Sequence, residues 1–456
     1  MNRNLIKYIF AVISIFYTVN SAQAANIVYP KSQNTVINAP RTFFIGNEVA
    51  NKTLTINDEK VEIHPSGGFY HVVALREGEN TFKINNGSSI KKYTITRNSS
   101  AVSPKKDKFI TYNAPITAFT SENNVPIRSI PNENGLNRLQ HLEKDIPLSI
   151  VGEYGNFYKV QLCRDDYVWI AKSHVKKIPE YTNSLSEIQS YNYIEDNKNR
   201  VFEIKLSKKV PYILTESDGF DLVLYGIKNL PYNKYEFHIN KSGKNFGYTS
   251  FYKSDNTLTI KIKKYPTIDS SRPLKDLTVV VDAGHGGNEF GAIGCLGHKE
   301  KEINLHIAMK IKSLLENAGA NVIMTRQKDE SLSLKDRVDI TNNNNADLFI
   351  SIHNNALPDS SAHLKTSGTE VYYFYPQSKA FAKSVLESIT KETGMKNNKA
   401  RAESFAVIRN TNCPAILVEI GYMINPEDNA KLIDPEFQNK AAKSILHGLE
   451  KYLNEL

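Results

Sequence analysis

From residue 26 to residue 266, polar and apolar positions alternate in short runs that are separated by turn residues. Alternation with a period of two is the pattern of a β-strand that buries one face. The runs form three groups, which predict three small all-β domains at residues 26–98, 110–178 and 185–266. The first group resembles a small immunoglobulin-like β-sandwich, and a polar, lysine-rich linker is expected at 99–108.

The pattern changes after Lys275. An apolar strand at 277–281 is followed by helical periodicity at 302–315, and strands and helices then alternate to the end of the chain. We predict further strands at 321–324, 348–352, 369–374 and 415–419, and helices at 334–342, 378–393 and 436–453. This alternation predicts a C-terminal α/β domain at 275–456, with a largely parallel sheet flanked by helices.

The first residues have the pattern of a signal peptide. Arg3 and Lys7 precede an almost wholly apolar run at 8–19, and Ala22-Gln23-Ala24 gives a small-x-small cleavage pattern. We therefore expect a signal peptide at 1–24 and a secreted protein, either periplasmic or associated with the cell wall. An uncleaved membrane anchor is the alternative, and the shortness of the apolar run argues against it.

The net charge of +9 is concentrated in the front of the chain. Lys and Arg outnumber Asp and Glu by 36 to 25 up to Leu274, whereas from Lys275 onward acidic residues outnumber basic ones by 23 to 21. A basic surface favours anionic partners, although a lysine-rich surface can equally serve solubility alone. No nucleic-acid-binding motif is present, so nucleic acid is not an expected partner.

The three cysteines are far apart and odd in number, which argues against a disulfide framework. Cys413 precedes Pro414 within an apolar run. Packing in the core is therefore a better interpretation of Cys413 than a role as a nucleophile.

Two histidines and two carboxylates occur where predicted strands end or helices begin. His285 lies in the glycine-rich segment after the first strand, and Glu300 lies just before the first predicted helix. His353 and Glu419 each end a predicted strand. Because the carboxyl ends of parallel strands meet at one edge of a sheet, these four residues can converge on one crevice.

Two imidazoles and one carboxylate form a standard catalytic zinc shell, in which the fourth position holds water. A second carboxylate can then accept the proton of that water and pass it to a leaving nitrogen. Each residue alone has a plainer interpretation, since a lone histidine is more often a structural hydrogen-bonding group and a lone glutamate is usually solvated. It is the joint pattern that favours a metal hydrolase.

Five motifs resemble the zinc-type N-acetylmuramoyl-L-alanine amidases, the amidase 3 family. They are residues 280–287 (VVDAGHGG), 300–305 (EKEINL), 325–326 (TR), 351–356 (SIHNNA) and 417–422 (LVEIGY), and the resemblance runs from Leu277 to the end of the chain. It implies that His285, Glu300 and His353 bind Zn²⁺ and that Glu419 is the catalytic acid/base. It also implies a peptidoglycan hydrolase that cleaves the amide between the lactyl group of N-acetylmuramic acid and L-alanine.

Two of the front domains also resemble modules of wall hydrolases. Residues 155–160 (GNFYKV) and 168–170 (VWI) resemble bacterial SH3-like barrels, and 185–266 loosely resembles the β-rich targeting modules that precede some amidases. The amidase resemblance implies that peptidoglycan is a partner, and the basic charge of the front domains favours anionic wall polymers as further partners, with solubility alone as the open alternative.

The chain departs from the family pattern in three places. Glu289-Phe290-Gly291 occupies a turn that is commonly Asp-Pro-Gly, which predicts a reshaped turn and an intact site. His298, two residues before Glu300, is a rival metal ligand. The stretch 356–368 is too short for the blocking helix of some family members, so any restraint on activity is expected from the front domains.

Two other functions remain open at this point. The chain could be another zinc-dependent wall hydrolase, a peptidase or a deacetylase, and product identity would separate these from an amidase. It could also be a wall-binding protein with a silent catalytic domain. The presence of all four key residues disfavours this last function.

Overall fold

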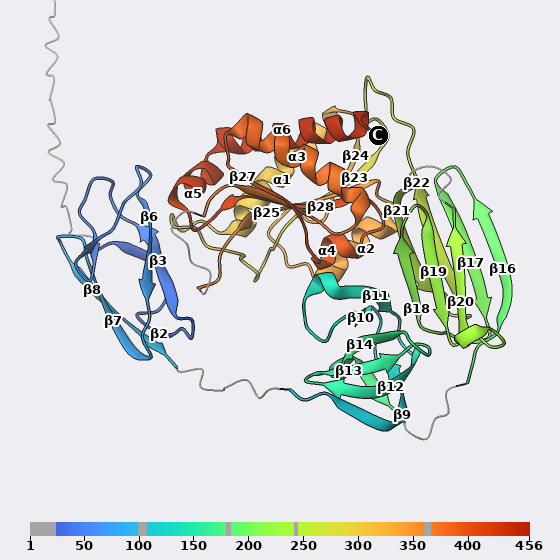
Figure 1. Ribbon diagram of the computed structural model, residues 1–456. Helices are drawn as coiled ribbons and strands as arrows, with labels where there is room; N and C mark the ends of the chain where they lie inside the picture. The colour runs from blue at the N-terminus through green and yellow to red at the C-terminus, as the bar shows by residue number, and fades with distance from the viewer. Residues whose placement is uncertain (1–23, 99–106, 179–183, 241–244, 360–365) are drawn as a thin grey trace, which may run out of the picture.

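The structure, a computed structural model, describes residues 24–98, 107–178, 184–240, 245–359 and 366–456 (Figure 1). The expected signal peptide, apart from Ala24, lies outside the described residues, as does most of the expected linker at 99–108. No helix within the described ranges has the length and apolar character needed to cross a membrane.

The first β-rich segment, residues 24–98, contains two sheets. One consists of β1 (Asn26–Tyr29), β3 (Arg41–Asn47) and β6 (Gly68–Ala74), in the order β1-β3-β6. The other has the order β2-β8-β7-β4-β5 and consists of β2 (Asn34–Val36), β4 (Thr55–Ile56), β5 (Glu59–Lys60), β7 (Gly78–Asn85) and β8 (Ile90–Arg97). Phe44 joins them, because its ring packs edge-on against Phe82 and Tyr93 at 5.4 Å. This packing of two inner faces is that of a β-sandwich.

The second β-rich segment, residues 107–178, forms one sheet in the order β11-β10-β14-β13-β12-β9-β15. Its strands are β9 (Ile110–Thr120), β10 (Val125–Arg128), β11 (Arg138–Leu142), β12 (Pro147–Tyr154), β13 (Phe157–Gln161), β14 (Tyr167–Ala171) and β15 (Val175–Lys177). Ile127, Val160 and Ile170 are fully buried and form part of its core.

The third β-rich segment, residues 184–264, has two sheets. One has the order β16-β17-β22-β21 and consists of β16 (Ile188–Glu195), β17 (Asn199–Leu206), β21 (Asn245–Tyr252) and β22 (Thr257–Lys264). The other consists of β18 (Tyr212–Glu216), β19 (Phe220–Tyr225) and β20 (Lys234–Ile239). The buried side chains of the second and third segments form one continuous apolar cluster. These two segments are therefore packed together and share a core.

The C-terminal domain contains a six-stranded sheet with the order β24-β23-β25-β28-β26-β27. Its strands are β23 (Thr278–Ala283), β24 (Asn321–Met324), β25 (Leu348–Asn355), β26 (Thr369–Tyr373), β27 (Asn397–Ala402) and β28 (Ala415–Tyr422). Every neighbouring pair is parallel except β26 and β28, which are antiparallel. The sheet is thus mixed, and the expectation of a largely parallel sheet misses this junction.

Helices cover both faces of this sheet (Figure 1). They are α1 (Glu300–Asn317), α2 (Leu334–Asn343), α3 (Lys379–Thr393), α4 (Ala406–Arg409), α5 (Pro426–Ile433) and α6 (Pro435–Asn454). Val279 and Val281 belong to the cluster beneath α1, α3 and α6, whereas Val280 belongs to the cluster beneath α4. This alternation is why β23 is apolar at consecutive positions.

The third β-rich segment is tied to the C-terminal domain through Lys263 of β22. Its ammonium donates to the backbone carbonyl oxygen of Asn345 at 2.8 Å and lies 2.8 Å from Asp347 Oδ1. Asp347 Oδ2 in turn accepts from the backbone N–H of Thr278 at the start of β23. Lys263 is 9% exposed, so solvent screens this pair weakly.

We predict that Lys263→Ala destabilises the C-terminal domain by about 3 kcal/mol, because it leaves the Asp347 carboxylate without its cation. Lys261→Ala is the matched control. Its side chain is partly exposed and its ammonium donates to Asn345 Oδ1 at 3.3 Å, without a buried carboxylate partner among the described residues, so an effect within about 0.5 kcal/mol is expected. Calorimetric unfolding of the full chain measures both variants, and equal transition temperatures would contradict the prediction.

Candidate metal centre

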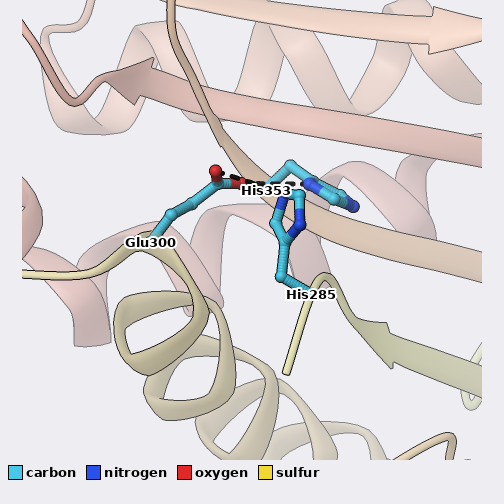
Figure 2. Close-up of side chains that lie close together, drawn as sticks. All are labelled: His285, Glu300 and His353. Carbon is cyan, nitrogen blue, oxygen red and sulfur yellow. Dashed lines mark hydrogen bonds and ion pairs between the residues drawn. The ribbon is translucent and has the colours of Figure 1, made fainter. Parts of the chain in front are cut away.

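Three side chains from separate elements converge at the carboxyl edge of the C-terminal sheet (Figure 2). His285 follows β23, Glu300 begins α1, and His353 lies on β25. His285 Nε2 is 3.2 Å from Glu300 Oε2, and His353 Nδ1 is 3.0 Å from Glu300 Oε1. One ligand atom from each residue lies within 4.8 Å of the others, so the group can hold a metal ion.

Glycines make room for this convergence. A Cβ atom at Gly284 would lie 2.2 Å from the ring of His353, and one at Gly291 would lie 2.3 Å from Glu300 Oε2. His285 itself has a φ of 59°, in the left-handed region that non-glycine residues seldom adopt. The glycine-rich segment therefore directs His285 toward Glu300 and leaves space for the second imidazole.

Glu300 is 4% exposed, and both of its oxygens are hydrogen-bonded. Oε2 accepts from the backbone N–H of Ala292 at 2.8 Å, and Oε1 accepts from the backbone N–H of Asn354 at 3.1 Å and from Asn304 Nδ2 at 3.2 Å. Burial acts to raise the pKa of Glu300, but hydrogen bonds and charge from His285 and His353 outweigh it and hold this pKa below its ordinary value. Glu300 is therefore an ionised carboxylate ready to bind a cation.

A buried ion pair supports the loop that carries His285. Asp282 and Arg337 are both almost fully buried, and Arg337 Nη1 is 2.6 Å from Asp282 Oδ1. Arg337 Nη2 donates to the backbone carbonyl oxygen of His285, and Arg326 donates to those of Ala283 and Gly284. Burial acts to raise the pKa of Asp282, but the charge of Arg337 lowers it overall. The two guanidinium groups thus hold the backbone of this loop.

Glu419 lies on β28, directly opposite His353 in the parallel register of β25 and β28. Its Oε2 atom is buried and has no hydrogen-bond partner among the residues described by the structure. Burial raises the pKa of Glu419 well above its ordinary value, and the carboxylates of Glu300 and Glu370 add to this shift. The side chain is therefore a half-buried acid that has one buried oxygen without a hydrogen-bond partner among the described residues, beside the three converging side chains.

A family model described as N-acetylmuramoyl-L-alanine amidase matches residues 279–451, which include all four of these side chains. The protein of Bacillus subtilis named "Uncharacterized protein YqiI" is 34% identical over 194 residues, which make up 42% of this chain and 91% of YqiI. The chain belongs to the N-acetylmuramoyl-L-alanine amidase family. The matched residues lie in the C-terminal domain, hereafter the amidase-family domain.

Other relatives match a comparable share of the chain. "Probable cell wall amidase LytH" of Staphylococcus saprophyticus is 39% identical over 200 residues, which are 43% of this chain and 65% of LytH. The match therefore spans slightly less than two thirds of that relative. The catalytic domain of CwlV, an N-acetylmuramoyl-L-alanine amidase from Bacillus (Paenibacillus) polymyxa, is 40% identical and covers 39% of this chain and 98% of its own, with a TM-score of 0.37.

Glu370 of β26 is a further residue of the amidase-family site that the sequence analysis missed. It lies opposite Glu419 in the antiparallel register of β26 and β28 and is 5% exposed. Its carboxylate accepts from Asn355 Nδ2 at 3.1 Å and from the Tyr372 hydroxyl at 2.5 Å, and Arg401 Nη2 lies 3.3 Å from Oε1. A glutamate at an inward position of a predicted strand was the available signal, but nothing in the sequence indicated that this strand runs antiparallel to β28.

The remaining expectations about the site have different outcomes. His298 is exposed and does not belong to any metal-holding group found among the described residues. Cys413 is 2% exposed within an apolar cluster, which confirms it as a core residue. In the turn at 289–291, where the sequence differs from the family pattern, Phe290 is 41% exposed. The ammonium groups of Lys299 and Lys301 lie over its ring. The stretch expected to lack a blocking helix includes residues 360–365, which are outside the described residues.

The first β-rich segment touches the loops of the amidase-family site. The Tyr29 hydroxyl donates to Asp359 Oδ2 at 2.9 Å and the Thr42 hydroxyl donates to Asp359 Oδ1 at 2.5 Å, shortly after the end of β25. Phe43 and Ile45 of β3 pack with two residues of the amidase-family domain, Cys295 and Ile424. Because Cys295 lies between His285 and Glu300 in the chain, this contact reaches the segment that carries two of the three converging side chains.

We predict that His353→Ala weakens binding of a divalent metal by at least about 100-fold, since it removes one of three ligands. His298→Ala is the matched control and should bind metal as the unchanged protein does. Competition with a chromophoric chelator measures both affinities. A loss in His298→Ala as large as that in His353→Ala would show that the ligand set is different.

Proposed function

We propose that the chain is a zinc-dependent N-acetylmuramoyl-L-alanine amidase in which His285, Glu300 and His353 bind Zn²⁺ and Glu419 is the catalytic acid/base. The observation that carries this proposal is the convergence of two imidazoles and one ionised carboxylate beside Glu419, whose buried Oε2 atom has no hydrogen-bond partner among the described residues. Two histidines and a carboxylate are a donor set typical of catalytic zinc. When bound, the ion activates a water molecule and polarises the carbonyl group of the substrate.

The proton transfers fall to Glu419. Its raised pKa suits a group that must accept a proton from the attacking water and then donate it to the departing amide nitrogen. The buried Oε2 atom, which lacks a hydrogen-bond partner among the described residues, is the proposed acceptor, and the register position of Glu419 opposite His353 supports this role. Glu370 raises the pKa of Glu419 through its charge and does not itself need to contact substrate.

The proposed substrate is peptidoglycan, and the proposed bond is the amide between the lactyl group of N-acetylmuramic acid and L-alanine. Family membership and the cell-wall amidase relatives support this choice. We also propose export by a signal peptide at 1–24 and wall targeting by three front domains at 26–98, 110–178 and 185–266. The excess of basic residues before Leu274 supports contact between these domains and anionic wall polymers.

The test is digestion of purified peptidoglycan by the mature chain, with and without a chelator, followed by mass spectrometry of the released fragments. We expect intact stem peptides with a free L-alanine amino terminus, lost with chelator and restored by zinc. Released acetate would indicate a deacetylase, and cut crosslinks would indicate a peptidase. No release in any condition would favour a silent, wall-binding protein.

We predict that Glu419→Gln lowers kcat by about 100- to 10,000-fold while zinc remains bound, because it removes the proton shuttle and no metal ligand. Parallel measurements of turnover and of zinc content in the purified variant check this. Substantial turnover in Glu419→Gln would assign the acid/base role to another residue.

We predict that Glu370→Gln moves the acidic limb of the pH profile of kcat/KM to lower pH. A general base acts when deprotonated, so the raised pKa of Glu419 places this limb above the ordinary carboxylate value of about 4.3. Removing the negative charge of Glu370 removes one cause of that rise. Arg401→Gln is the control variant. It removes the cation that pairs with Glu370 and keeps the negative charge of Glu370, so the acidic limb of kcat/KM should not move to lower pH.

A further inference from the structure

A cavity lies where the second and third β-rich segments meet the amidase-family domain, and its lining does not include the three converging side chains. Its volume is about 910 Å³, and it is lined by β11 of the second β-rich segment, β18 and β21 of the third, and α2 and α4 of the amidase-family domain. Small-molecule sites in proteins commonly have volumes of about 300–1,000 Å³ and often lie between domains. We call it the junction cavity.

Basic side chains gather at the junction cavity. Arg138 and His141 of β11 and Arg409 of α4 line it, and the charge of Arg128 of β10 acts on His141. The register of β10 and β11 shifts after Ile127, which is how residues three positions apart on β11 come to face one cavity. The site thus combines residues from two parts of the chain that are far apart in sequence.

Several nitrogen atoms of this group lack a partner. The Nε atoms of Arg138 and Arg409 and the Nε2 atom of His141 are buried and make no hydrogen bond with any described residue. Arg409 is 7% exposed. Buried donors are normally paired, and a cationic donor is more costly to leave unpaired than a neutral one. An anion in the cavity would satisfy them.

The charges of the group act on one another. Burial, and then the charges of Arg409, Arg138 and Arg128, lower the pKa of His141 to about 3. Burial and the charges of Arg138 and Arg128 lower the pKa of Arg409 to about 10. The three guanidinium groups are therefore close enough to repel each other, and an added negative charge would relieve that repulsion.

The carboxylates near the group have other hydrogen-bond partners, except that Glu143 Oε2 is buried without a partner among the described residues, and burial raises the pKa of this carboxyl group. Glu133 pairs with Arg128 at 3.1 Å and has a side chain that is 73% exposed, so solvent weakens its effect on the group. Glu143 accepts from the backbone N–H of Tyr252 at 2.8 Å, and Glu216 accepts from Asn245 Nδ2 at 2.9 Å. Within the described ranges, no carboxylate forms an ion pair with Arg138 or Arg409.

Arg409 and Arg128 are each held by hydrogen bonds within their own part of the chain, and the two parts meet where Ser404 packs on Gly135. Arg409 Nη1 donates to the carbonyl oxygen and the hydroxyl of Ser404, at 2.6 and 2.8 Å. Ser404 packs so closely on Gly135 that a Cβ atom there would lie 2.4 Å from the Ser404 Cβ. Arg128 Nη1 fixes the same turn through the carbonyl oxygen of Asn134 at 2.9 Å. The basic group is therefore pre-organised across the junction.

We propose that the junction cavity binds an oxyanion, the carboxylate or phosphate group of a small ligand, between Arg138 of β11 and Arg409 of α4. Guanidinium groups recognise both kinds of oxyanion through paired N–H donors. The bound anion bridges the second β-rich segment and the amidase-family domain, so binding stabilises the contact between them. This inference does not depend on the reaction proposed for the metal centre.

The test is a titration of the full, chelator-treated chain with sodium phosphate and, separately, with sodium acetate, followed by calorimetric binding and by the unfolding temperature. The chelator treatment removes bound metal ions, which could otherwise bind the added anion themselves. A saturable rise in the unfolding temperature beyond that given by sodium chloride at equal ionic strength is expected. A response to phosphate alone identifies a phosphate ligand, and a response to both identifies carboxylates as well. A response to neither overturns the proposal.

Arg138→Gln should weaken the anion response at least tenfold, and Arg409→Gln should do the same. Arg164→Gln, an exposed arginine of the same β-rich segment outside the cavity, is the matched control and should respond as the unchanged chain does. If Arg409→Gln fails to fold because Ser404 loses its donor, Arg138→Gln alone decides. An undiminished anion response in Arg138→Gln would contradict the proposal.

Discussion

The carboxylate of Glu300 is 4% exposed and ionised, so both of its oxygens must be paired within the protein. The surrounding structure meets that requirement with two imidazoles, two backbone N–H groups and the amide of Asn304. Those partners belong to the loop after β23, to α1 and to β25, so pairing one carboxylate fixes three elements relative to one another. The same constraint explains the glycines at 284 and 291, because a Cβ atom at either position would collide with His353 or with Glu300.

The four key residues could be predicted from sequence because each stands at an element boundary with a strong local signal. His285 lies among glycines after an apolar strand, and His353 and Glu419 follow apolar runs. Their convergence then follows from the geometry of parallel strands. Glu370 could not be found in this way, because its place beside Glu419 depends on β26 running antiparallel to β28. Strand direction is decided by connections and packing across the whole sheet.

The comparison of predicted and observed element bounds leads to the same distinction: elements with a strong local sequence pattern were predicted, and elements that depend on distant pairing were missed. The predicted strand at 321–324 coincides with β24, and the predicted long helices differ from α1, α3 and α6 by at most two residues at either end. The short elements β27, α4 and α5 were missed. β27 is mostly exposed and gains its strand conformation by pairing with β26, while α4 is a single turn. The cap of α5 by Asn425 before Pro426 was a local signal that could have been used.

The contact between the first β-rich segment and the amidase-family domain couples the substitutions that two distant stretches of sequence can tolerate. Phe43 and Ile45 fill the same apolar cluster as Cys295 and Ile424, and Asp359 accepts from Tyr29 and Thr42. A larger side chain at one of these positions needs a smaller one across the contact. The side chains tolerated between His285 and Glu300 therefore depend on the shape of a sheet some 250 residues earlier in the chain. Substitutions in the two regions should be correlated.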